Sequence, residues 1–183
     1  MQPKRKVSHY EHDPIEEADK VCNDYINREG ITLHFADADR AFYSPSCDTV
    51  QVPPPTSYSN LAEYYSTLFH ELTHSTGHPN RLNRIKSTSF FGNTEYSKEE
   101  LVAEVGANMI MSALGIENNA AQKNSIAYLQ GWLQALKNDM TMIVSACSKA
   151  QKAADYILEH NEECSEKSLS SQISPSGRTG TIV

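Results

Sequence analysis

The sequence predicts a single α+β domain in which a small antiparallel sheet lies beside one amphipathic helix and a C-terminal group of helices. The hydrophobic pattern has a helical period up to residue 30, alternates as strands do between residues 31 and 52, and becomes helical again after three prolines. A length of 183 residues suits one domain with its own core. We therefore expect a polar N-terminal segment at residues 1–13, the domain at 14–160 and a disordered tail at 161–183.

The first helix and the sheet are predicted from short-range signals. A helix begins after Pro14 and ends at Gly30, because proline favours the start of a helix and glycine its end. Three runs rich in β-branched and aromatic residues follow, separated by turns rich in Asp, Ser and Pro. These runs are ITLHF, AFY and TVQV, and the prolines at 53–55 end the last of them.

Helices are predicted again after the prolines. One has Asn60 as its N-cap and ends near Gly77, and the next begins at Ser97 and stops near Gly115. Two more helices are expected from apolar stripes with a spacing of three and four residues. The stripes are Ile126, Leu129, Leu133 and Leu136, followed by Met140, Ile143, Cys147, Ala150, Ala154 and Ile157.

Charge and composition exclude several classes of partner. The formal net charge of −7 argues against a general affinity for nucleic acid or anionic lipid. No apolar run approaches the length that a membrane span needs, and no signal core follows the first residues. The four cysteines are scattered without a CxxC pair, which suits reduced thiols. We expect a cytoplasmic protein that binds neither membrane nor nucleic acid in general.

The expected second helix contains the motif HExxH, formed by His70, Glu71 and His74. Residues four apart share one face of a helix, so both imidazoles can bind one Zn²⁺. Glu71 is then placed to act as general base on a zinc-activated water that attacks a peptide bond. A shuffled chain of this composition would contain only about 0.02 copies of the motif. Two histidines and a glutamate on a purely structural helix face remain the plain alternative.

Catalytic zinc usually has three protein ligands, and two places in the chain offer the third. His78 directly follows the glycine that ends the helix, and a loop or groove role competes there with a ligand role. The other place is the next helix, where Glu100 and Glu104 lie on one face. One of these carboxylates can bind metal while the other orients a histidine. Glu99 is about 100° further round the helix and is expected to face solvent.

Alternatives remain for the acidic helix and for the substrate-binding groups. Ser97 and Glu100 also match a capping box, and the acidic residues could form a solvated face. Tyr96 and His78 are candidates for stabilising an oxyanion, next to simple packing or capping roles. The strand Thr49–Val52 precedes the motif helix and could align a substrate by β-addition.

Two resemblances to known families sharpen these alternatives. The pattern Glu100-Leu-Val-Ala-Glu104 resembles the ExxAD arrangement of glutamate-zincins, which implies that Glu100 is the third ligand and that Glu104 orients a histidine or serves as an alternative ligand. The runs YYSTLFHELTHSTGHPNRLNR, EYSKEELVAEVGA, AYLQGWLQALKND and SKAQKAADYIL resemble the zincin-like metallopeptidase domain of ArdC-type antirestriction proteins from conjugative plasmids and other mobile elements. The similarity covers about residues 40 to 158.

The ArdC resemblance implies a zincin-like fold with His70 and His74 as metal ligands and Glu71 as general base. Members of this family usually carry an N-terminal domain for single-stranded DNA, and residues 1–39 are too short to form one. We therefore do not expect this chain to bind DNA through such a domain. The expected activity is that of a zinc-dependent peptidase acting on a protein or peptide, with a link to antirestriction. The metal is Zn²⁺ in this hypothesis, although Mn²⁺ or another divalent ion fits the same ligands. The alternative is a metal-binding interaction protein that engages a host defence protein without cleaving it.

Overall fold

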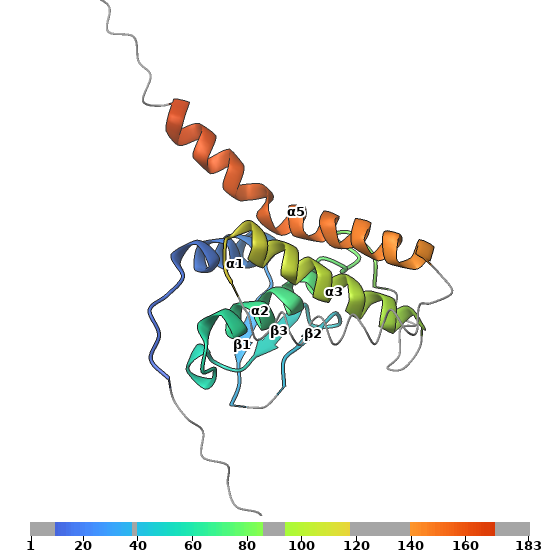
Figure 1. Cartoon of the computed structure of the whole chain (residues 1–183), viewed down its shortest axis with the longest axis horizontal. Coiled ribbons are helices and arrows are strands. Elements are labelled where there is room, and N and C mark those ends of the chain that lie inside the picture. The colour runs from blue at the N-terminus through green and yellow to red at the C-terminus, as the bar shows by residue number, and fades with distance from the viewer. Residues whose placement is uncertain (1–9, 38–39, 86–93, 118–139, 171–183) are drawn as a thin grey trace, which may run out of the picture.

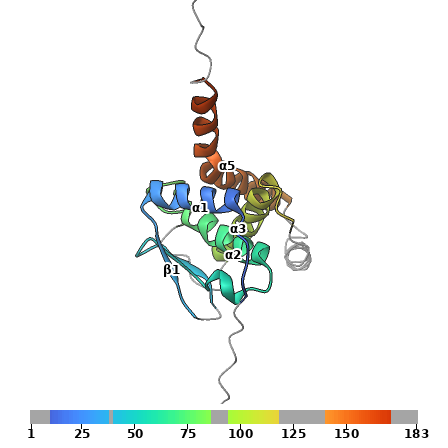
Figure 2. The same ribbon diagram turned by 90° about the vertical axis from the view of Figure 1, so that its left-hand side faces the viewer.

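The computed structural model describes residues 10–37, 40–85, 94–117 and 140–170, and its helices lie over a small sheet (Figures 1 and 2). The expected helical stripe at 126–136 falls outside these residues. Along the described chain the elements are α1 (Glu16–Glu29), β1 (Thr32–Phe35), β2 (Phe42–Ser44), β3 (Thr49–Val52), the short 3₁₀ helix η1 (Pro55–Ser57), α2 (Leu61–Ser75), α3 (Thr94–Ala113) and α5 (Met140–Ser170).

The sheet is mixed, with the strand order β1-β3-β2. β2 and β3 are antiparallel, as expected, and are joined by a turn in which Asp48 has a φ of 46°. β1 is parallel to β3, with Thr32 opposite Thr49. The expectation of a wholly antiparallel sheet is therefore wrong for this pair. The reason is that β1 and β2 do not form a hairpin, so β3 enters between them and runs in the same direction as β1.

The main core lies where α1, α2 and the sheet meet, and residues from α3 and α5 complete it. The cap of α2 is as expected, because the side chain of Asn60 accepts a hydrogen bond of 2.9 Å from the backbone N–H of Ala62. α1 ends at Gly30 in the left-handed conformation, also as expected. The largest fully buried side chains of this core are Tyr25, Tyr65, Phe69, Leu68, Leu72 and Ile110.

A buried arginine ties the end of α2 to α1 and to the sheet. Arg81 donates hydrogen bonds to both carboxylate oxygens of Asp48, at 2.9 and 2.6 Å, and to Glu29 at 3.0 Å. It also donates to the backbone oxygen of Ser75 at 2.9 Å. Only 2% of the Arg81 side chain is exposed, so these bonds compensate for the burial of its charge.

α3 lies against α2 on one side and α5 on the other, and its contact with α2 includes a glycine. A Cβ atom at Gly106 would lie 2.7 Å from the Thr73 side chain, so only a residue without a side chain allows this spacing. α3 begins at Thr94, earlier than the expected start at Ser97. Ser97 is therefore inside the helix, and the capping-box interpretation is wrong.

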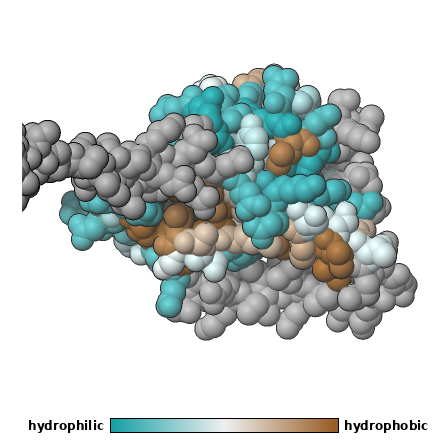
Figure 3. All heavy atoms as spheres, turned by 90° about the horizontal axis from the view of Figure 1, so that it is seen from above, coloured by the Kyte–Doolittle hydropathy of each residue, from teal (hydrophilic) through white to brown (hydrophobic). Residues whose placement is uncertain are grey.

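α5 continues to Ser170, ten residues into the segment expected to be a disordered tail. The sequence there contains Glu and Lys, which favour helix without needing a buried face. Residues 171–183 lie outside the described part of the chain. The described surface seen from the α5 side is mainly hydrophilic with separate hydrophobic patches (Figure 3). None of the described helices is both long and apolar enough to cross a membrane.

Candidate metal centre

The two histidines of HExxH lie one helical turn apart on the side of α2 that faces α3. Their ring centroids are 4.8 Å apart, and the Nε2 atoms of His70 and His74 approach to 3.2 Å. Apolar neighbours such as Phe69 and Leu72 are buried in the main core, which fixes the rotation of the helix. The spacing of four residues therefore brings both imidazoles to one point, as the sequence predicts.

Glu100 reaches the same point from α3. Its Oε1 lies 3.4 Å from Nε2 of His74, and its Oε2 lies 3.7 Å from Nε2 of His70. One donor atom from each of His70, His74 and Glu100 lies within 4.8 Å of the other two. Two imidazole nitrogens and one carboxylate oxygen are a donor set that suits Zn²⁺ and related divalent ions. The residues present therefore fit a metal.

Each histidine has a second carboxylate behind its outer nitrogen. Nδ1 of His70 lies 3.4 Å from Glu104, and Nδ1 of His74 lies 3.5 Å from Glu99. An acceptor at Nδ1 orients the ring and leaves the Nε2 lone pair for a metal. The placement of Glu104 agrees with the predicted orienting role. The expectation that Glu99 faces solvent is wrong, because α3 is rotated so that Glu99 points towards the end of α2.

Arg84 explains why Glu99 turns inward. It donates to the two oxygens of Glu99, at 2.8 and 3.2 Å. The same guanidinium donates to Thr76 Oγ1 at 2.7 Å and to the backbone oxygen of Thr73 at 2.9 Å. Its side chain is only 7% exposed. Sequence reasoning missed Arg84, because an arginine in a turn after a helix gives no sign that it is buried.

Burial and carboxylates set the protonation of the cluster. Burial lowers the pKa of His70, but hydrogen bonds to Glu100 and Glu104 outweigh it and raise that pKa to about 10. Burial raises the pKa of Glu100, yet hydrogen bonds from His70 and His74 hold that pKa well below its ordinary value. The carboxylates around His70 and His74 therefore favour a positive charge at the two imidazoles, either as protons or as a bound metal cation.

Glu71 lies on the same cleft and is almost entirely buried, with 7% of the residue exposed. Burial raises the pKa of Glu71, and the nearby charges of His74 and His70 lower it in part. A backbone hydrogen bond from Tyr43 in β2 also favours the carboxylate form. Glu71 is thus held between α2 and the sheet, close to both histidines.

The cleft has a volume of about 1140 Å³ and runs between β2, α2 and α3. Phe42, Tyr43 and Ser44 of β2 line it, whereas the Thr49–Val52 strand does not. That strand is β3, the central strand, and its hydrogen-bonding edges are already occupied by β1 and β2. The hypothesis that Thr49–Val52 aligns a substrate by β-addition is therefore wrong, and within the described part of the chain the unpaired edge beside the cleft belongs to β2.

The two candidates for oxyanion stabilisation lie in different places. Tyr96 lines the cleft and donates a hydrogen bond to Glu100. His78 lies in the turn after α2, where its Nδ1 accepts a hydrogen bond of 3.2 Å from the backbone N–H of Asn80. His78 is not part of the donor cluster and does not line the cleft.

An HExxH helix beside a small sheet, with a glutamate of the following helix close to both histidines, is the arrangement of the glutamate-zincins, a group of zincin metallopeptidases. The chain belongs to the zincin-like metallopeptidase family, whose model matches residues 20–149. The match includes the whole of α2 and α3, with all the donor residues. The family resemblance indicated by the sequence is confirmed.

Relatives with known names support the same assignment. The chain superposes on the antirestriction protein ArdC from plasmid R388, solved with Mn(II), with a TM-score of 0.65 and 36% identity over 86% of this chain and 56% of ArdC. The metal-free ArdC structure gives a TM-score of 0.63 at the same identity, over 85% of this chain and 53% of ArdC.

Sequence relatives include two proteins named DNA primase TraC from Escherichia coli and the uncharacterised protein y4eC of Sinorhizobium fredii. The TraC sequences are 37% and 33% identical over 73% and 89% of this chain. The y4eC sequence is 34% identical over 78% of this chain. The match spans only 12% and 11% of the TraC sequences and 44% of y4eC, so the chain corresponds to a part of each of these relatives.

Proposed function

We propose that this chain is a metal-dependent peptidase domain that hydrolyses a peptide bond in a protein or peptide substrate. In this proposal His70, His74 and Glu100 bind the metal, and Glu71 is the general base. The observation that carries the proposal is the convergence of these four side chains on one cleft, with the three donor atoms within 4.8 Å of one another. Family membership supports the same chemistry.

Each residue of the cluster has a separate task. When bound, the metal polarises the scissile carbonyl and acidifies a water molecule. Glu71 takes a proton from that water and passes it to the leaving amine, for which its partly raised pKa is suitable. Glu104 and Glu99 hold the imidazoles of His70 and His74 in the orientation that exposes Nε2. Tyr96 restrains Glu100 from the cleft side.

The substrate is positioned along β2. Within the described residues β2 pairs only with β3, so the backbone groups of its other edge that do not bind Glu71 are open to an extended peptide. Because Tyr43 of β2 contacts Glu71 through its backbone, a peptide bound on this edge passes close to the general base. β-Addition of this kind recognises the peptide backbone and accepts many side chains.

Zinc is the metal we propose, since two histidines and one carboxylate are a common donor set of catalytic zinc. The ArdC relative has been solved with Mn(II), which supports testing manganese as well. The test is hydrolysis of a quenched-fluorescence peptide library by protein loaded with Zn²⁺ or Mn²⁺, against chelator-treated protein and the Glu71→Gln variant. Cleavage that persists in the chelator or in Glu71→Gln would contradict the proposal.

The likeness to an antirestriction protein supports a role for the chain in the same setting. We propose that its target is a protein of the host defence system. Plating of unmodified phage on a restricting host, with and without the chain, measures this directly. If Glu71→Gln protects phage as well as the wild-type chain does, the domain acts by binding its target and the non-proteolytic alternative replaces the peptidase.

A further inference from the structure

The mouth of the cleft carries positive charge from three separate segments. One cation precedes β2, one lies on α3 and two lie on α5. Three of the four are exposed, and the one on α3 is half-buried. They are Arg40, Lys98, Lys149 and Lys152.

The carboxylates that line the same cleft are already engaged. Glu100 contacts both histidines, and Glu99 pairs with Arg84. Glu71 is buried beside the histidines. No other acidic residue of the described chain lines the cleft. The accessible charge that the described residues place at the mouth is therefore positive, although the whole chain has a net charge of −7.

The cations on α5 are held at the cleft by helix packing. Ala146 and Ala150 of α5 are buried against Leu101 and Val102 of α3. Lys149 and Lys152 are three residues apart, which places them on one side of the helix, and both line the cleft. Neither lysine takes part in an ion pair within the residues that the structure describes.

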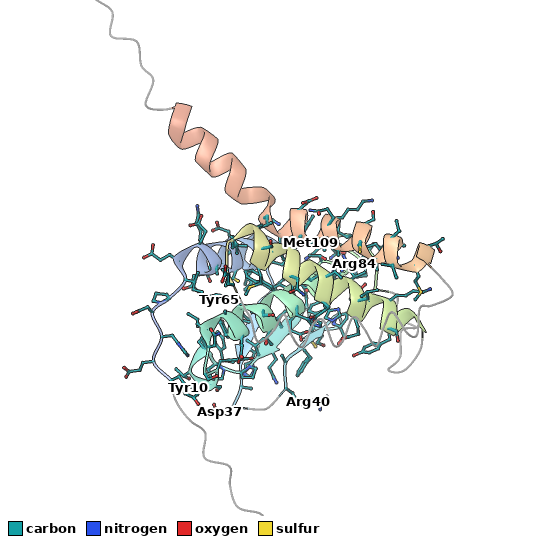
Figure 4. All side chains as sticks on the ribbon, viewed as in Figure 1. Tyr10, Asp37, Arg40, Tyr65, Arg84 and Met109 are labelled. Carbon is teal, nitrogen blue, oxygen red and sulfur yellow. The ribbon has the colours of Figure 1, made fainter. Side chains whose placement is uncertain are left out.

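Arg40 supplies charge from another wall. It lies two residues before β2, at the loop below the helices (Figure 4). Arg40 and the two lysines of α5 line the cleft from different segments, so a peptide added to the β2 edge would meet cations of both. Side chains of an extended peptide point alternately to opposite sides, so a substrate can present carboxylates to both walls.

We propose that the cleft selects acidic peptides, with Asp or Glu on either side of the cleaved bond. This inference rests on the proposed peptidase function and adds its substrate class. Carboxylates of the peptide complement the cations at the mouth. The donor atoms of His70, His74 and Glu100 remain available for the metal. A nucleic acid is the less favoured polyanion, because its many phosphates would meet the repulsion of a chain with a net charge of −7.

Binding is measured with the zinc-loaded Glu71→Gln protein, so that no turnover is needed. The probe is a short fluorescein-labelled peptide in which Glu residues flank a central apolar pair, and its twin has Gln in place of each Glu. Fluorescence anisotropy gives both affinities in low and high salt. Lys149→Gln and Lys152→Gln are compared with Lys20→Gln, which removes an equal charge from an exposed position on α1 away from the cleft.

The acidic peptide should bind more tightly than its twin, and salt should remove the difference. Each cleft lysine variant should weaken acidic-peptide binding by about two- to five-fold and leave the twin unchanged, while Lys20→Gln changes neither. Equal losses for both peptides, or an equal loss in Lys20→Gln, would overturn the inference. So would tighter binding of a single-stranded oligothymidylate than of the acidic peptide.

Failure of the peptidase proposal has a different signature. In that case the metal-loaded wild-type chain cleaves neither peptide, whereas the anisotropy measurements still report whether the cleft prefers carboxylates. Cleavage of both peptides at equal efficiency would keep the peptidase and remove the acidic preference.

Discussion

Nδ1 of His74 lies 3.5 Å from Glu99, a carboxylate on a different helix. Glu99 is itself fixed by two hydrogen bonds from Arg84. The ring of His74 is therefore oriented by a chain of contacts that begins in the turn after α2 and ends on α3. His70 has Glu104 in the corresponding position, and the side-chain amide of Asn108 donates a hydrogen bond of 3.5 Å to that carboxylate.

We expect Glu99→Ala to weaken metal binding by about 10- to 100-fold, because His74 loses the acceptor that fixes its ring. Glu99→Gln should lie between this variant and the wild type, since the amide oxygen still accepts a hydrogen bond. Competition titration with a chromophoric zinc chelator measures both. Glu17→Ala, an exposed acid on α1, is the control and should leave the affinity unchanged.

The roles of Glu100 and Glu104 can be separated by the same titration. Glu100→Ala removes a proposed ligand and should reduce metal affinity more than any other single glutamate variant. Glu104→Ala leaves three ligands in place but frees His70, so its loss should be about 10- to 100-fold. A larger loss at Glu104 than at Glu100 would exchange the two roles.

Glu71→Gln should retain the metal and abolish hydrolysis. The amide oxygen can still accept the backbone hydrogen bond from Tyr43, so the local structure has no reason to change. The proton acceptor for water is lost, which should lower kcat by at least about 100-fold. Metal content by elemental analysis is the control, and wild-type turnover in this variant would remove Glu71 from the role of general base.

Acid should weaken the fold in part through Asp48. Burial raises the pKa of Asp48. Hydrogen bonds from Arg81 and Tyr43 lower that pKa by more than burial raises it, so the net pKa is below its ordinary value. A lowered pKa gives stability that is complete above about pH 3.9 and is lost as the pH falls through the folded-state value. Asp48→Asn removes this contribution and keeps the positive φ, which asparagine tolerates.

The measurement for Asp48 is urea unfolding of chelator-treated protein at several pH values. The wild type should be more stable than Asp48→Asn at neutral pH, and the gap should close on acidification below about pH 4. A gap that stays constant with pH would show that Asp48 contributes no titration-linked stability.

Gly106→Ala should push α3 away from α2. The added Cβ would lie 2.7 Å from Thr73, and the overpacking should cost about 1–3 kcal/mol despite the better helix propensity of alanine. Metal affinity should fall as well, because the carboxylates move away from the histidines. Thr73→Ser removes the contacting methyl group, so adding it to Gly106→Ala should restore both properties in part. Thermal unfolding and zinc titration of the two variants test this.

The sequence predicts those parts of the site that depend on spacing within a single helix. His70, Glu71 and His74 are fixed by the period of one helix, and Glu100 and Glu104 by the period of another. Glu99 was assigned to solvent because its orientation depends on Arg84, fifteen residues earlier, and only the tertiary structure brings the two together.

The same limit applies to the fold. The end of α1 at Gly30 and the N-cap of α2 at Asn60 follow from residue type, and the sequence predicts both. The parallel pairing of β1 with β3 depends on which strand takes the central place in the sheet, and three short alternating runs contain no information on that place. The sequence predicts that the last helix ends before residue 161, because the residues from 161 to 170 continue α5 without an apolar stripe and resemble a polar tail.

The two helices that form the centre are packed into clusters of different size. α2 presents its histidines from the main core, where Phe69 and Leu72 have no exposed surface. The first half of α3, which carries the carboxylates, rests on a smaller cluster in which Leu101 and Val102 meet two alanines of α5. We therefore expect that exchanging the bound ion for one of larger radius shifts the first half of α3 more than it shifts α2.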